Sequence, residues 1–116
     1  MDIVPDQLKK DNGIFFARAK SGNPPDRIAG CENLVENLIA TMKIIGETKY
    51  DRDLDSCNHW AQRSQKNYYE DHDIVSALSH CNAIINKIGY LCYNPEYAQL
   101  QSDRFKFTPE VKPSGT

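Results

Sequence analysis

The sequence predicts an all-α protein, a small antiparallel bundle of three main helices. Three segments, at about residues 25–45, 51–70 and 73–92, place apolar or small side chains at alternate spacings of three and four, which is the period of one helix face. Short polar or glycine-bearing stretches separate these segments, so consecutive helices should lie side by side and antiparallel. A chain of 116 residues has room for one such domain.

The segments outside the three helices are expected to be organised differently. Residues 1–22 should form an N-terminal arm or a short helix, which Gly13 weakens. The helical bundle domain should span residues 23–102, followed by an extended C-terminal tail over residues 103–116. Within that tail, residues 104–108 alternate polar and apolar side chains, as a strand or an extended arm does.

The first main helix has start and stop signals at its two ends. Pro24 and Pro25 suit a first helical turn, where Asp26 also faces the helix dipole favourably. Gly46 is typical of a C-terminal cap. Gly30 lowers helix stability unless it lets a neighbouring backbone come close. The apolar face comprises Ile28, Cys31, Val35, Leu38, Met42 and Ile45.

The second main helix begins with acidic residues and presents a face of mostly small side chains. Asp51, Asp53 and Asp55 place negative charge in the first turn, where the helix dipole favours it. The buried face is expected to comprise Leu54, Cys57, Ala61, Ser64 and Tyr68. Because small side chains bury little apolar area, this helix should depend on the larger side chains of its neighbours.

The third main helix is predicted to be the central helix of the bundle, because it carries two apolar stripes side by side. The first stripe comprises Ile74, Ala77, Cys81, Ile84, Ile88 and Leu91, and the second comprises Val75, Leu78, Asn82, Ile85, Gly89 and Cys92. A helix with two adjacent stripes can pack between two neighbours. Asp71 or Asp73 should cap its start, and Asn94 followed by Pro95 should end it.

Charge and cysteine content exclude several classes of protein. The net charge is −2, and residues 30–100 alone carry −4, so no basic face is expected and binding to duplex nucleic acid is disfavoured. No apolar run reaches the length of a membrane span, and no apolar leader is apparent at the N-terminus. The four cysteines lie at apolar helical positions without a CxxC motif. They predict buried free thiols, which are typical of a reducing compartment and hence of a cytoplasmic protein. Because no apolar run could span a membrane, no membrane contact is expected.

No residue pattern predicts a catalytic residue, a metal site or a cofactor. Cys57 and His59 are two residues apart and would diverge on a helix, so they cannot chelate together. The acidic turn around His72 suits helix capping better than general acid–base chemistry. Helical ribonucleases of the HEPN type place an arginine a few residues before a histidine on one helix, whereas Arg63 and His72 are nine residues apart with a helix end between them.

Aromatic side chains are candidates for a protein interface, because they are enriched among residues that dominate binding energy. The interface candidates are Phe15, Phe16, Tyr69, Tyr90, Tyr93, Tyr97, Phe105 and Phe107. The best-supported function is a non-catalytic interaction module of adaptor or inhibitor type, which binds a protein partner or self-associates. Two alternatives stay open. One is a helical nuclease or nucleotide-handling enzyme that uses His72 or His80 with a carboxylate or Arg63, and the other is a protein that binds a small ligand or nucleotide between helices.

The stretch from about residue 60 to 91 combines an aromatic residue, a short acidic turn, an Asp with apolar neighbours, Ala-Leu and a later Gly-aromatic-Leu element. The matching positions are Tyr68 or Tyr69, Asp73, Val75, Ala77, Leu78, Gly89, Tyr90 and Leu91. In this order it resembles an archaeal family of short helical-bundle proteins of unknown function. The chain departs from the family at Ser64 and Gln65, where the family carries Asp-Ala, and at Cys92, where the family carries Asp. The resemblance implies a helical bundle in a cytosolic protein and no activity.

Overall fold

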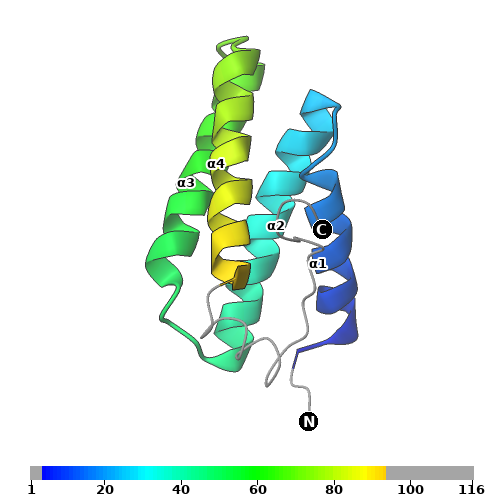
Figure 1. Cartoon of the computed structure of the whole chain (residues 1–116), viewed down its shortest axis with the longest axis vertical. Helices are drawn as coiled ribbons and strands as arrows, with labels where there is room; N and C mark the ends of the chain where they lie inside the picture. Colours follow the sequence, from blue (N-terminus) through cyan, green and yellow to red (C-terminus); the bar gives the residue numbers. More distant parts are fainter. Residues whose placement is uncertain (1–3, 94–116) are drawn as a thin grey trace.

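The computed structural model describes residues 4–93, which form four helices and no strand (Figure 1). The helices are α1 (Asp6–Arg18), α2 (Pro24–Ile45), α3 (Asp51–Tyr69) and α4 (Ile74–Tyr93). The predicted all-helical architecture, with three main helices and a short N-terminal helix, agrees with this arrangement to within one or two residues at each main helix end. The expected extended tail lies outside the described residues.

Helix α2, rather than α4, is the central helix. It contacts each of the other three described helices, whereas α1 contacts α2 alone. Figure 1 shows α1 on one side of α2 and the antiparallel α3–α4 hairpin on the other. The prediction of a central helix over residues 73–92 is therefore wrong.

The two apolar stripes of α4 show why that prediction failed. The first stripe is buried at Ala77, Cys81 and Ile84, but on the second Val75 is 77% exposed and Asn82 is also exposed. Helices α2 and α3 contact each other directly, so α4 does not lie between them. It packs against both with one wide face.

Local capping residues fix the ends of α2 and the start of α4 as the sequence predicts. The Asn23 side chain accepts a hydrogen bond from the Asp26 backbone N–H at 3.2 Å, with prolines in the first turn between them. Gly46 ends α2 in the left-handed conformation, at φ +72°. Asp73 accepts hydrogen bonds from the backbone N–H and the hydroxyl of Ser76, at 3.0 and 2.6 Å, which lowers the pKa of its carboxyl.

Gly30 lets the end of α1 lie directly against α2. A Cβ atom at this position would be 2.4 Å from the Ala19 backbone nitrogen and 2.6 Å from the carbonyl carbon of Arg18. These are backbone atoms and cannot rotate away, so only glycine permits the contact. Of the two possibilities left open for Gly30, the structure shows the close approach of a neighbouring backbone.

A buried polar contact also joins α1 to α2. The side-chain amide of Asn12 donates to the Asn37 side-chain oxygen at 3.1 Å, and the Asn37 amide donates to the Leu8 carbonyl at 3.0 Å. Both asparagines are buried, so these hydrogen bonds satisfy groups that would be costly to leave unpaired. This contact sets the register of α1 on α2, and apolar periodicity gave no sign of it.

The core between α2, α3 and α4 contains three free thiols, those of Cys31, Cys57 and Cys81, all fully buried. Burial raises the pKa of Cys57 to about 12. A hydrogen bond between the Cys31 and Cys81 side chains raises the pKa of Cys31 and lowers that of Cys81. The pKa of Cys81 is lowered further by a hydrogen bond with Ser64, whose oxygen lies 3.4 Å from the Cys81 sulfur. The prediction of buried free thiols is confirmed for these three residues, and the side chain of Cys92 lies outside the described set.

Candidate binding groove

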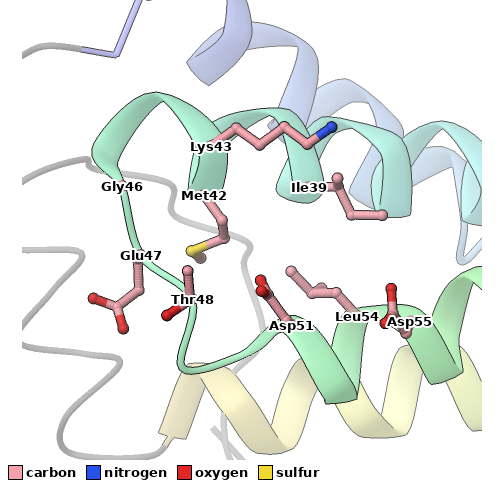
Figure 2. A pocket seen from close by; sticks show the side chains of 9 residues that line it. All are labelled: Ile39, Met42, Lys43, Gly46, Glu47, Thr48, Asp51, Leu54 and Asp55. Carbon is pink, nitrogen blue, oxygen red and sulfur yellow. The ribbon is translucent and has the colours of Figure 1, made fainter.

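A hollow of about 420 Å³ lies at the surface of the described residues, between the end of α2 and the start of α3. We call it the lower hollow. Figure 2 shows Ile39 of α2 and Leu54 of α3 pointing toward one another across it, with Met42 beside them. The remaining lining residues are Lys43, Gly46, Glu47, Thr48, Asp51 and Asp55. The lower hollow thus has an apolar floor and a mostly acidic rim.

A second hollow of about 360 Å³ lies between the same two helices, nearer to the start of α2 and the end of α3. We call it the upper hollow. Its lining is polar apart from one alanine and comprises Glu32, Glu36, Asn58, Ala61, Gln62 and Gln65. The Gln65 amide donates a hydrogen bond to the Glu32 carboxylate, which links the two helices across this hollow.

The two hollows follow one another along one groove between α2 and α3. On α2, the lining residues Glu32, Glu36, Ile39 and Lys43 recur at spacings of four, three and four, so they share one helix face. On α3, lining residues from Asp51 to Gln65 recur in the same way. We call this feature the α2–α3 groove.

The α2–α3 groove opens away from α4. On α3, Asp53 pairs with Lys87 of α4 at 3.6 Å, and Ser64 contacts Cys81 of α4. These α4-facing positions lie on the opposite side of α3 from Asp55, because residues two apart on a helix point about 200° apart. The α2–α3 pair therefore has one side covered by α4 and one side that holds the groove.

Negative charge dominates the groove. Its lining includes five carboxylates, those of Glu32, Glu36, Glu47, Asp51 and Asp55, and a single ammonium group, that of Lys43. Within the described residues, the carboxylates of Glu36, Asp51 and Asp55 take part in no ion pair and accept no side-chain hydrogen bond. Within residues 4–93, no basic side chain compensates their charge.

Apolar residues are exposed at the turn between α3 and α4. Tyr68 and Tyr69 stack edge to face with ring centroids 4.9 Å apart, and together with His72 and Ile74 they line a hollow of about 330 Å³. Beside it, Val75 is also exposed. We call these five residues the hairpin tip. His72 has a positive φ of 53°, which closes the turn, and its side chain faces this hollow.

Those predicted aromatic interface residues whose side chains the structure describes do not lie together. Tyr69 lies at the hairpin tip, whereas Tyr90 is exposed sixteen residues after the start of α4, about 24 Å further along that helix. Phe15 lies on α1 and is half-buried against the core. Phe16 is only 2% exposed, so it is a core residue and not part of a surface. The side chain of Tyr93 and the residues Tyr97, Phe105 and Phe107 lie outside the described part of the chain.

The residues considered for an enzyme are not assembled into a site. Between residues 4 and 93, the side chains of Arg63, His59, His72 and His80 form no ion pair or hydrogen bond, and no group of three His, Cys, Asp or Glu could hold a metal ion. His80 has a buried Nδ1 atom without a hydrogen-bond partner. In this same part of the chain, no helix is both long and apolar enough to cross a membrane.

Apolar periodicity does not reveal the groove, because most of its lining residues lie on the polar faces of two helices. A signal was present in the spacing of like charges. Glu32 and Glu36, and likewise Asp51 and Asp55, are four residues apart, and like charges at this spacing destabilise an isolated helix. The Glu32–Glu36 pair lies inside α2 and indicates a surface whose charge serves something other than helix stability, whereas the helix dipole also favours Asp51 and Asp55 at the start of α3.

The comparison with known proteins gives no family for this chain. No family model matches it, and neither the curated proteins nor the solved structures contain a match. The resemblance of residues 60–91 to an archaeal helical family stays a prediction. The interpretation of the groove accordingly rests on its shape and charge.

Proposed function

We propose that this protein is a non-catalytic helical interaction module that binds a protein partner through the α2–α3 groove. The observation that carries the proposal is the combination of an apolar floor with five groove carboxylates, three of which have no partner within the described residues. Uncompensated charge of one sign along a groove favours encounter with a partner of opposite charge. The apolar floor supplies area whose burial on binding is favourable.

The buried thiols support a cytoplasmic location for this module. Cys31, Cys57 and Cys81 are free and lie in the same core, which is the arrangement expected in a reducing compartment. Adaptor and inhibitor proteins both fit the proposal. Self-association through the hairpin tip is an alternative mode of the same function, because Val75 and Ile74 expose apolar surface there.

The test compares two double variants with the same change in net charge. Glu36→Arg with Asp55→Arg reverses two exposed groove charges, and Asp6→Arg with Glu70→Arg reverses two exposed charges outside the groove. Affinity capture from a cell lysate should yield a specific partner with the wild type and the second variant, but not with the first. Equal capture by both variants would show that the groove does not bind the partner.

Size-exclusion chromatography with light scattering, run on the same proteins, measures self-association. A dimer that persists in both charge variants and is lost in Val75→Ser would assign self-association to the hairpin tip. A protein that is monomeric and captures nothing would contradict the interaction-module proposal as a whole.

The lower hollow favours a second candidate function, the binding of a small ligand. Its volume of about 420 Å³ falls in the range of ligand sites, which is roughly 300–1,000 Å³. A thermal-shift screen with nucleotides and small cationic metabolites tests this function, because a ligand at 100 times its Kd adds about 2.7 kcal/mol of stability. A ligand whose shift is lost in Ile39→Ser and retained in Ile14→Ser would support it.

A further inference from the structure

We infer that the occupant of the α2–α3 groove is a basic amphipathic helix of a partner protein. This inference rests on the proposed function and specifies its partner. The groove offers the occupant three features: a row of carboxylates, an apolar floor at one end, and a length set by α2 and α3.

The charge of the groove selects a cationic occupant. Glu36, Asp51 and Asp55 are exposed and have no partner within the described residues, and Lys43 is the single base in the lining. An anionic segment placed here would bring like charges together with little compensation. Lysine or arginine side chains would instead supply the counter-charge that these carboxylates lack.

The apolar residues are confined to one end of the groove. Ile39 and Leu54 face each other in the lower hollow, while the upper hollow is lined by Glu32, Glu36 and three amide side chains. The occupant should therefore be apolar toward one end and basic toward the other. This asymmetry also fixes the direction in which it binds.

The shape of the groove favours a helix over an extended segment. Helix α4 already packs against α2 and α3 on the opposite side of the pair, which shows that two antiparallel helices of this spacing accept a third. The lining on α2 and its C-cap extends from Glu32 to Gly46, a rise of about 21 Å along the helix axis. An occupant of about four helical turns matches this length, as in other helix-in-groove complexes.

The spacing of the upper carboxylates adds a further requirement. Glu32 and Glu36 are one helical turn apart on α2, so two basic side chains one turn apart on the occupant can meet both. Arginine suits this position better than lysine, because its planar guanidinium pairs with a carboxylate through two hydrogen bonds.

The experiment uses a defined peptide and measures its binding by fluorescence anisotropy. The labelled peptide has about 15 residues, mostly alanine and glutamine. One of its helical faces carries leucines toward one end and two arginines, one turn apart, toward the other end. There are two control peptides. The first has the same composition in shuffled order, and the second has glutamate in place of each arginine. We expect saturable binding of the first peptide, at least about tenfold weaker binding of both controls, and weaker binding as salt is raised.

Variants of the full chain assign this binding to the groove. Glu36→Arg with Asp55→Arg should weaken binding of the peptide at least about tenfold, whereas Asp6→Arg with Glu70→Arg should change it by less than about twofold. Ile39→Ser should weaken binding and Ile14→Ser, an exposed isoleucine of α1, should not. Circular dichroism and thermal unfolding of each variant establish that it is folded before binding is measured.

Three outcomes would overturn the inference. Equal effects of the groove and control variants would show that overall charge attracts the peptide, and equal binding of the glutamate peptide would show that the groove does not select cations. In the third outcome, the variant Glu36→Arg with Asp55→Arg no longer captures the partner, but the basic peptide does not displace this partner from the wild type. This result would reject the basic helix as the occupant and leave the proposed function standing.

Discussion

The two sides of the α2–α3 pair differ in chemistry although the same two helices build both. The side that faces α4 carries small buried residues such as Cys57 and Ser64, which let α4 approach closely. The opposite side carries Glu36 and Asp55, which stay exposed and unpaired within the described residues. Small side chains thus complete the fold on one side, while like charges line the other side, where we propose that a partner binds.

The largest effect should come from a cavity on the covered side. Replacing Ile84, which is fully buried on α4, with alanine should destabilise the protein by about 2–5 kcal/mol through lost apolar burial and an unfilled cavity. Val75→Ala on the exposed stripe of the same helix should change stability by less than about 0.5 kcal/mol. Urea unfolding measures both, and similar values for the two variants would contradict the assignment of covered and open faces.

The second largest effect should come from the surface of α2 that α1 covers near Gly30. Gly30→Ala places a Cβ atom 2.4 Å from the Ala19 backbone nitrogen, so α1 must shift, at a cost of about 3 kcal/mol. Gly13→Ala is the matched control, because nothing lies within 4 Å of its Cβ. The control should stabilise α1 by about 0.5–1 kcal/mol. Loss of stability in Gly13→Ala instead would show that the α1 surface is packed against something else.

The pH dependence of stability reports the burial of the thiols on the covered side. The pKa of Cys57 is about 12 in the folded protein and near 9 in an unfolded chain, so its stabilising contribution is complete below pH 9 and is lost as pH rises toward 12. At pH 10.5 the loss should be about 2 kcal/mol. The measurement is the difference between wild type and Cys57→Ala in urea unfolding at pH 7, 9 and 10.5. A difference that does not change with pH would mean that solvent reaches this thiol.

The smallest effect is expected on the open side. Glu36→Gln with Asp55→Asn removes two repelling charges from the groove and should raise stability by about 0.2–0.5 kcal/mol at low salt. Because the charges are exposed, this gain should disappear at high salt. Thermal unfolding at two salt concentrations checks the prediction. A clear loss of stability would show that these carboxylates stabilise the fold, and the charge argument for a partner would then fail.

The sequence predicted the features that depend on neighbouring residues in the chain. Pro24, Gly46 and Asp73 mark helix ends because start and stop signals act within a few residues, and the apolar spacing on α2 identifies its buried face. The central helix was predicted wrongly because apolar stripes do not say which helices pair. Val75 belongs to a stripe by spacing and yet remains exposed.

The groove could be predicted only in part for the same reason. The repeated acids Glu32 and Glu36 are visible in the sequence, but their position opposite Gln65 depends on how α2 and α3 pack. The polar contact between Asn12 and Asn37 spans twenty-five residues and likewise requires the packed structure.

The attachment of α1 to α2 alone makes it the most readily released part of the described fold. Lifting α1 breaks one interface, whereas lifting any other described helix breaks at least two. Its backbone amides should therefore exchange with solvent deuterium before those of α3 and α4, through a partial opening that leaves the α3–α4 hairpin in place. Such an opening would bare the α2 surface around Gly30 while the groove between α2 and α3 stays intact.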